Sequence, residues 1–186
     1  IGHSLARQYG PEPWTLYKGA HLLSFVDNHD VTRIASKLRD PAHLPLIYAL
    51  LFGMPGTPAL YYGSEWGISG EKAPCSDAGL RPALEKPEWN ALTSWIARLA
   101  AARRGSPALR EGGYRNVLLT NLQLIFERRT ETERVLVAVN ADSQPYTAHF
   151  DAGCGLAWDL ISGQQHDFGG GSQLPPYSAF FWKMER

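Results

Sequence analysis

The sequence predicts an α/β segment followed by an all-β segment. In the first half, two short apolar runs of strand length flank one apolar helical segment. In the second half, short apolar runs alternate with polar or glycine-rich separators. The composition is 44% hydrophobic and 19% charged over 186 residues. These proportions are ordinary for a globular protein of one domain or two small ones.

The first half has the pattern strand, helix, strand. The runs LLSFV (22–26) and PALYY (58–62) suit strands buried on both faces. The apolar segment 43–52 between them predicts a helix, with Asp40 as its N-cap. Because a single helix connects the two strands, we expect them to be parallel.

A long loop and a second helix complete the first half. The glycine- and proline-rich segment 63–87 has a length that is uncommon for a loop without a function. The segment 88–105 predicts an amphipathic helix between Pro87 and Gly105. The apolar positions at helical spacing are Trp89, Leu92, Ile96 and Leu99.

The second half predicts an antiparallel β-sandwich. Short strands at near-regular spacing are typical of this architecture. We place the boundary near residues 106–112, with one domain at 1–108 and a second at 109–186. The expected strands are 116–120, 122–129, 134–140, 144–150, 156–160 and 178–184.

Charge and composition exclude several classes of partner. Lys and Arg number 18 and Asp and Glu number 18, so the net charge is zero. Nucleic acid and anionic membrane usually require a basic surplus, and we expect neither. We expect Cys75 and Cys154 to be reduced thiols, which slightly favours a cytoplasmic protein. The first residues lack the apolar core of a signal peptide and do not begin with Met. We therefore expect a piece of a longer protein.

Polar side chains crowd the end of the first predicted strand. Asp27, Asn28, His29 and Asp30 follow Phe25 and Val26 directly. In parallel α/β folds the active site lies at the carboxyl ends of the strands, and the segment 60–67 ends the neighbouring strand. The polar cluster suits sugar chemistry, metal binding or a structurally capped strand end. The remaining histidines form no pairs at ligand spacing, so we predict no metal site and no cofactor in this chain.

Two motifs resemble the α-amylase family. FVDNHDVTR (25–33) resembles the family's signature at the seventh strand of its (β/α)8 barrel. MPGTPALYYGSEWG (54–67) resembles the family's stretch at the eighth strand. The resemblance implies that 88–105 is the eighth barrel helix and that 110–186 is the carboxyl-terminal β-sandwich. It points most closely to members that degrade maltodextrins or cyclomaltodextrins.

The resemblance also implies roles for individual residues. Asp30 matches the third catalytic carboxylate, which stabilises the transition state, and His29 matches the histidine that binds sugar hydroxyls. Arg33 matches a motif arginine, which we assign to substrate binding or to the support of a site carboxylate. Tyr62 and Trp66 are candidate sugar contacts. For Asp27 and Glu65 we favour loop stabilisation over catalysis.

The chain should then be catalytically incomplete. The family's retaining mechanism needs a nucleophile and a general acid/base, which the resemblance places upstream of this sequence. We expect the isolated chain to be inactive and to self-associate through unpaired barrel strands. The expected ligand is an α-glucan oligosaccharide, with calcium possible in the full-length protein. The alternative is a non-catalytic glucan-binding or structural sandwich, with Tyr114, Tyr146, Trp158 or Trp182 as platforms.

Overall fold

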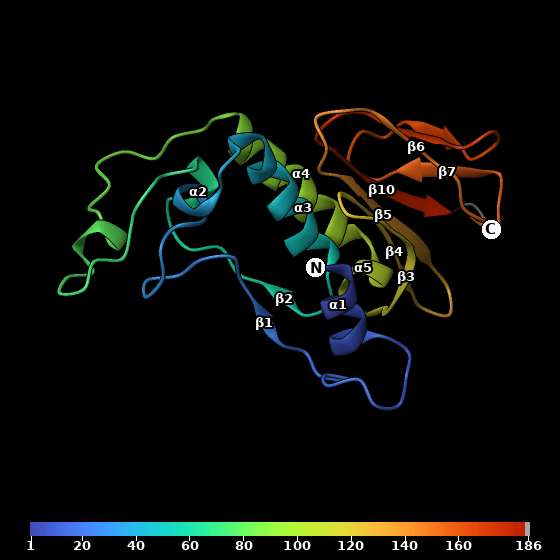
Figure 1. The fold of residues 1–186 in the computed structure, drawn as a ribbon, viewed down its shortest axis with the longest axis horizontal. Coiled ribbons are helices and arrows are strands. Elements are labelled where there is room, and N and C mark those ends of the chain that lie inside the picture. The colour runs from blue at the N-terminus through green and yellow to red at the C-terminus, as the bar shows by residue number, and fades with distance from the viewer. Residues whose placement is uncertain (185–186) are drawn as a thin grey trace.

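The structure is a computed structural model and describes residues 1–184. It has two parts that pack side by side (Figure 1). The helical part, residues 1–111, holds the helices, long loops and one short parallel strand pair. The sandwich part, residues 113–184, holds eight strands. This order matches the predicted α/β segment followed by an all-β segment.

The helical part contains a minimal parallel pair. Strands β1 (Leu23–Ser24) and β2 (Thr57–Pro58) are parallel, with Leu23 opposite Thr57. The parallel arrangement confirms the prediction, but each strand has two residues rather than five. Neither strand pairs with a third, so the ladder ends where the two strands diverge. Gly56 allows the close approach, because a Cβ there would lie 2.5 Å from the carbonyl oxygen of Leu22.

The helices begin at good capping residues. Asp40 accepts a hydrogen bond from Ala42 N at 2.9 Å and caps the 3-10 helix η1 (Pro41–His43), which continues into α3 (Leu44–Gly53). Helix α4 (Ala91–Gly105) begins later than predicted, because Asn90 and Thr93 form a capping box. Trp89 therefore lies outside the helix and is 75% exposed. The other helices are α1 (Gly2–Tyr9), α2 (Ile34–Lys37) and α5 (Pro107–Glu111), and two further 3-10 helices are η2 (Ser64–Trp66) and η3 (Ala78–Leu80).

The sandwich part consists of one large sheet and one small strand pair. Six antiparallel strands form a sheet in the order β3-β4-β5-β10-β7-β8, and β6 and β9 form a separate antiparallel pair. The sequence predicted six of these eight strands and missed β8 and β9, which are short and flanked by glycine. The bounds are β3 (Gly113–Leu119), β4 (Gln123–Arg129), β5 (Arg134–Asn140), β6 (Tyr146–Ala148), β7 (Leu156–Asp159), β8 (Gln165–Asp167), β9 (Ser172–Leu174) and β10 (Ser178–Met184).

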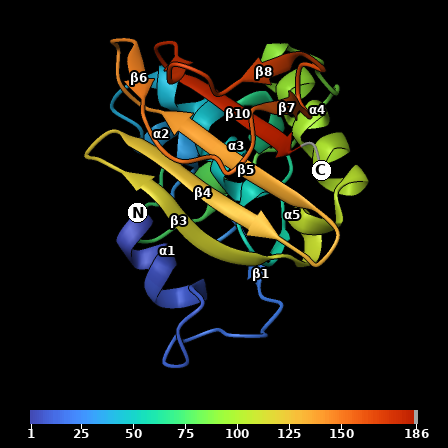
Figure 2. The same ribbon diagram turned by 90° about the vertical axis from the view of Figure 1, so that its right-hand side faces the viewer.

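Both faces of the large sheet are buried. Along β5, Val135, Val137 and Val139 belong to a core shared with the helices, whereas Leu136 and Ala138 belong to a second core on the opposite face. Side chains alternate between the faces of a strand, so one apolar run supplies both cores. Figure 2 shows α3, α4 and α5 behind the sheet. The pair β6–β9 contributes Ala148 and Leu174 to the second core.

Two buried arginines hold the carboxyl end of α3, and one of them, Arg128, joins the two parts. Arg103 of α4 donates to Phe52 O at 2.8 Å and to Met54 O at 2.9 Å. Arg128 of β4 donates to Gly53 O at 2.7 Å. The last carbonyls of a helix carry partial negative charge and lack partners within the helix, so the guanidinium groups satisfy them. Burial lowers the pKa of Arg103 to about 10 and that of Arg128 to about 9.

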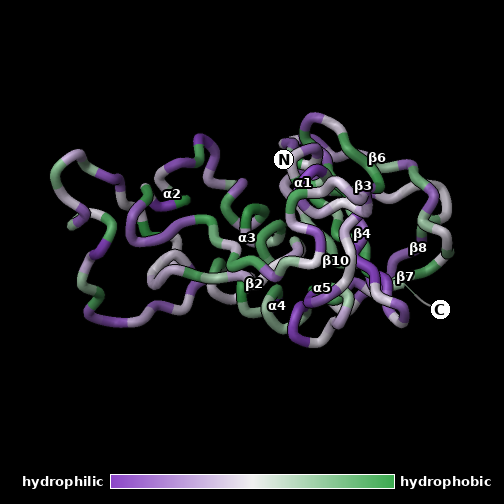
Figure 3. The backbone as a smooth tube through the Cα atoms, turned by 90° about the horizontal axis from the view of Figure 1, so that it is seen from below, coloured by the Kyte–Doolittle hydropathy of each residue, from purple (hydrophilic) through white to green (hydrophobic). Residues whose placement is uncertain are grey.

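The strand pair of the helical part leaves apolar side chains in solvent. Leu23 is 68% exposed, Phe25 49% and Leu60 41%, so the prediction that both strand faces are buried is wrong for this structure. Figure 3 shows apolar colour along α3 and α4, which lie between the mixed-colour loops of the helical part and the strands of the sandwich part. Among residues 1–184, no helix is both long and apolar enough to cross a membrane.

Candidate functional site

The FVDNHD segment follows β1 and presents two ionisable side chains to solvent. His29 Nε2 lies 3.1 Å from Asp30 Oδ2, and each side chain is 55% exposed. Asn28 fixes this geometry, because its Oδ1 accepts a hydrogen bond from Asp30 N at 2.9 Å. A carboxylate and an imidazole therefore stand together at the strand end, as the sequence predicted.

The long loop supplies a cation, Arg81, that no sequence pattern marks. Arg81 Nη2 lies 3.3 Å from Asp30 Oδ1 and 3.3 Å from Asp77 Oδ2. Its Nε donates to His29 O at 3.3 Å. Lys72 adds a hydrogen bond from Nζ to Asp30 O at 2.7 Å. The loop 63–87 thus returns to the strand end and holds Asp30 from two sides.

Asp27 has a structural environment. It is 2% exposed and accepts hydrogen bonds from Ser64 Oγ at 2.8 Å and from Ile34 N at 2.9 Å. Tyr48 donates from its hydroxyl to Ser64 O at 2.9 Å. Burial first, and then the charge of Asp27, raise the pKa of Tyr48 above its ordinary value. These bonds tie the turn after β1 to the turn after β2.

Arg33 is fully buried, so its predicted role as a substrate contact disagrees with this structure. Its Nη1 donates to Tyr62 O at 2.7 Å and to Ser64 Oγ at 2.9 Å, and its Nη2 donates to Leu80 O at 2.8 Å. The guanidinium lies 4.1 Å from the ring centroid of Tyr61. A planar fork can hold several carbonyls at once, and here it joins the two strand ends to the long loop.

The predicted aromatic contacts lie beside the site rather than on it. Tyr62 is 43% exposed, and its hydroxyl donates to Pro82 O at 3.0 Å. Trp66 is partly exposed in η2, where its carbonyl accepts from Asn90 Nδ2 at 3.0 Å. Tyr61 also lies near the ionisable pair, and its ring centroid is 6.3 Å from that of His29.

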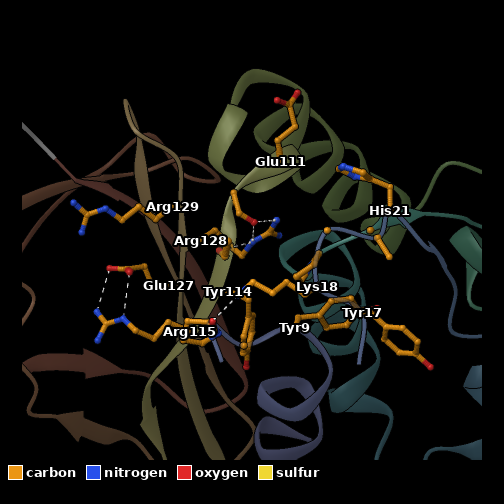
Figure 4. A pocket seen from close by; sticks show the side chains of 18 of the residues that line it. Tyr9, Tyr17, Lys18, His21, Glu111, Tyr114, Arg115, Glu127, Arg128 and Arg129 are labelled. Atoms are coloured by element: carbon orange, nitrogen blue, oxygen red, sulfur yellow. Dashed lines mark hydrogen bonds and ion pairs between the residues drawn. The ribbon is translucent and has the colours of Figure 1, made fainter. Parts of the chain in front are cut away.

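The other candidate features are distributed over the molecule. No group of three or more His, Cys, Asp or Glu side chains in residues 1–184 could hold a metal ion. Trp182 is 1% exposed and Tyr114 is 3% exposed, so both are core residues rather than sugar platforms. Trp158 is 47% exposed. A pocket of about 350 Å³ lies between α1 and the sandwich part, and none of its lining residues belongs to FVDNHD (Figure 4).

The fold and the motif at the strand end now identify the family. The family model described as alpha amylase, catalytic domain, matches residues 13–134, more than half of the chain. The chain belongs to the α-amylase family. The match covers both motifs, the long loop, helices α3 to α5 and the first strands of the sandwich part.

Known members of the family resemble the chain over most of its length. A cyclomaltodextrin glucanotransferase of Bacillus sp. (strain 38-2) is 29% identical over 152 residues, which are 80% of this chain and 20% of that protein. A γ-cyclodextrin glucanotransferase structure from Bacillus clarkii is 26% identical with a TM-score of 0.73, over 87% of this chain and 26% of the other. The chain thus spans about a fifth of the length of the curated relatives that it matches.

A third similarity concerns the fold alone. The α-amylase structure from Geobacillus thermoleovorans, complexed with acarbose, has a TM-score of 0.81 at 19% identity, over 99% of this chain and 46% of the other. Such neighbours, together with the mostly antiparallel sheet, fit part of a (β/α)8 barrel followed by a β-sandwich. The curated relatives are named for cyclomaltodextrin, as expected of the predicted subgroup, although the name describes a transferase.

Proposed function

We propose that this chain is part of an α-amylase-family enzyme that acts on α-glucosidic bonds of starch, maltodextrins or cyclomaltodextrins. In this proposal β1 and β2 are the seventh and eighth strands of the barrel. The observation that carries the proposal is the exposed pair of His29 and Asp30 at the end of β1, held by Arg81. Relatives named as glucanotransferases support either hydrolysis or glucanosyl transfer as the reaction.

Asp30 would act on the sugar ring at the cleaved bond. A carboxylate that accepts hydrogen bonds from ring hydroxyls stabilises a ring that distorts toward an oxocarbenium-like transition state. His29 would donate to a hydroxyl of the same ring. Arg81 would keep the Asp30 carboxylate in place, because its Nη2 contacts one oxygen and leaves the other beside His29. Arg33 and Asp27 would support the site from below, as parts of the buried framework.

The proposed mechanism is retaining, and it needs two further carboxylates. A retaining glycosidase places a nucleophile and a general acid/base on either side of the bond. Two described carboxylates of this region, Asp27 and Asp77, are already engaged. The first is buried and the second is held by Arg81. The nucleophile and the general acid/base would come from barrel strands outside this sequence, so the isolated chain would be inactive.

A pair of assays tests this proposal. The purified chain and its Asp30→Ala variant are incubated with a nitrophenyl α-maltoside, and neither should release nitrophenol. Release of nitrophenol by the chain that disappears in Asp30→Ala would mean that this chain holds all the catalytic carboxylates. The proposal that the nucleophile and the general acid/base lie outside this sequence would then be wrong.

Sugar binding tests the assignment of His29 and Asp30 directly. Maltotriose should perturb the NMR signals of the FVDNHD segment in the chain, and Asp30→Asn and His29→Ala should weaken this effect. Glu131→Gln changes an exposed carboxylate of the sandwich part and serves as the matched control. If all four proteins respond equally, the strand end does not bind the sugar ring.

The alternative function is a glucan-binding module, and one observation favours it. Trp158 is 47% exposed on β7, beside a shallow hollow lined by charged side chains. Exposed aromatic rings pack against the apolar faces of sugars. Retention of the chain on immobilised amylose that is lost in Trp158→Ala, but kept in Asp30→Asn, would support this function.

A further inference from the structure

The pocket between the two parts is built from both of them. Its volume is about 350 Å³, within the usual range for small-molecule sites, which occur preferentially at domain interfaces. Tyr9, Tyr17 and Lys18 come from α1 and the loop after it, and Tyr114 and Arg128 come from β3 and β4 (Figure 4). All of its lining residues lie within the described chain and away from Asp30.

The lining is rich in positive charge, although the chain as a whole is neutral. Five lining residues are cationic and two are acidic. The cations are Lys18, Arg110, Arg115, Arg128 and Arg129, and the acids are Glu111 and Glu127. A concave site lined by one sign of charge concentrates ions of the opposite sign.

The two acids do not cancel this excess. Glu127 is shared between Arg115, at 3.3 Å, and Arg134, which lies outside the pocket. These two arginines outweigh the cost of burial and lower the pKa of Glu127. Glu111 is 67% exposed and its carboxylate lies 3.8 Å from Arg110 Nε. Both acids are therefore already paired with cations, and the charges of Lys18, Arg128 and Arg129 are left without a paired acid in the lining.

Arg128 is bound by carbonyl groups rather than by a carboxylate among the described residues. Its Nε and Nη2 donate to Gly112 O, at 3.2 and 2.8 Å, and its Nη1 donates to Gly53 O. Each terminal nitrogen of a guanidinium carries two hydrogens, so one donor remains on each. Burial of this charge, together with the nearby charge of Arg103, lowers the pKa of Arg128 to about 9. An anion in the pocket would stabilise the charged form.

The rim offers donors that can turn toward a ligand. Lys18 is exposed, and its Nζ donates only to Pro11 O at 3.1 Å, an exposed bond that costs little to exchange. Arg110 is also exposed at the rim. The rings of Tyr9 and Tyr17, with centroids 5.8 Å apart, add apolar surface to the lining on the side of Lys18 (Figure 4).

We propose that this pocket binds phosphate, either free or esterified to a small sugar. The phosphate oxygens accept hydrogen bonds from Lys18, Arg110 and the unused N–H groups of Arg128, and the tyrosine rings pack against the body of an ester. Charge-assisted bonds of this kind are among the stronger hydrogen bonds in proteins. The proposal does not depend on the function proposed for Asp30.

Calorimetric titration of the full chain tests the site. Inorganic phosphate and glucose 6-phosphate are titrated at pH 7 and constant ionic strength, because exposed charges are screened by salt. The double variant Lys18→Gln/Arg110→Gln should weaken binding by about tenfold or more, as expected for lost hydrogen bonds to a charged group. Lys37→Gln/Arg39→Gln makes the same charge change at exposed positions outside the pocket and should bind like the unmodified chain.

The two ligands distinguish the sources of the phosphate. Tighter binding of glucose 6-phosphate would assign the site to sugar phosphates, and equal binding would assign it to the free anion. Absence of saturable binding to either ligand would overturn the proposal. Equal losses in the two double variants would also overturn it, because the effect would then reflect net charge alone. Thermal unfolding of each variant without ligand confirms that it is folded.

Discussion

The two parts of the molecule differ in how completely their strands are paired. The sandwich part has a six-stranded sheet with apolar side chains on both faces. The helical part has one pair of two-residue strands, and Leu23, Phe25 and Leu60 stay exposed beside it. Burial and backbone pairing supply most of the stability of a sheet. The sandwich part therefore has more backbone pairing of its own than the helical part, although one face of its sheet shares a core with the helices.

Helix α3 takes part in the contact between the two parts. This helix packs between α4 and the large sheet, where Tyr48 and Ala49 have no exposed surface. Its carboxyl end is held by Arg103 and Arg128, and the second of these reaches across from β4. The helical part is therefore attached by an apolar face and by a small number of buried polar bonds.

The largest expected effect comes from removing the buried arginine of β4. Arg128→Met keeps the length and apolar stem but leaves the carbonyls of Gly53 and Gly112 without these donors. Because unsatisfied buried groups each cost about 1–3 kcal/mol, we expect a total loss of about 3 kcal/mol in the free energy of unfolding. Urea unfolding followed by tryptophan fluorescence measures it. Arg129→Met, on the exposed neighbour, should change stability by less than about 0.5 kcal/mol. An equal loss of stability in the two variants would mean that the hydrogen bonds of Arg128 do not stabilise the contact between the two parts.

The next effect concerns the open outer edges of β1 and β2, which pair only with each other among the described residues. We expect the chain to self-associate through β1 and β2, because exposed strand edges flanked by apolar side chains pair readily. Leu23→Ser/Phe25→Ser should weaken association by about tenfold or more, given about 1.5–3 kcal/mol for each large apolar side chain buried. Sedimentation velocity over a range of concentrations measures this effect. Leu122→Ser, on a sandwich residue that is 46% exposed, is the control. A monomer at every concentration would contradict the expectation.

The sequence predicted the sandwich part better than the helical part, for a physical reason. Periodicity reports local burial, and the strands of the sandwich have neighbours on both faces, so β5 and β10 match their predicted bounds. Predicted strands 22–26 and 58–62 have only two residues each in the structure, because within residues 1–184 β1 and β2 pair only with each other. Trp89 fits the helical period, but the stronger cap at Asn90 excludes it.

For the candidate site, adjacency in sequence was enough to find Asp30 and His29. Arg81 reaches Asp30 from a position 51 residues later, and no local pattern marks it. Arg33 lies in the motif, which allowed either substrate contact or support of a site carboxylate. Tyr61, Ser64 and Leu80 enclose it in the fold, which agrees with the supporting role and not with substrate contact. A motif thus locates a functional region, but it does not show which of its residues contact substrate and which support the site from inside the fold.

A smaller effect is expected at Arg81, which joins the loop 63–87 to the segment that follows β1. It is 47% exposed, so its ion pairs with Asp30 and Asp77 should contribute less than about 1 kcal/mol to stability. Arg81→Ala should therefore leave global unfolding nearly unchanged but speed proteolytic cleavage within the loop 67–87. Arg104→Ala, on the exposed face of α4, is the matched control. Unchanged cleavage would mean that the other bonds of the loop suffice to order it.

The smallest effect is expected at the bond between Tyr177 and Asp40, which also joins the parts. The Tyr177 hydroxyl donates to Asp40 Oδ2 at 2.7 Å. This bond, followed by the bond from Ala42 N, lowers the pKa of the Asp40 carboxyl. A carboxyl with a lowered pKa in the folded state stabilises the protein above its unfolded pKa, and that contribution is lost as the pH falls through the folded value.

Tyr177→Phe should therefore lower the melting temperature slightly at neutral pH, and the difference from the unmodified chain should shrink toward pH 3. The substitution keeps the ring against His43 and the same left-handed backbone at φ +49°, so it removes the hydroxyl alone. Both proteins lose other acid-sensitive contributions, since Glu127 and Glu133 also have lowered pKa values, and the comparison cancels these. A difference that stays constant from pH 7 to pH 3 would mean that the Tyr177 hydroxyl acts through packing rather than through the Asp40 carboxylate.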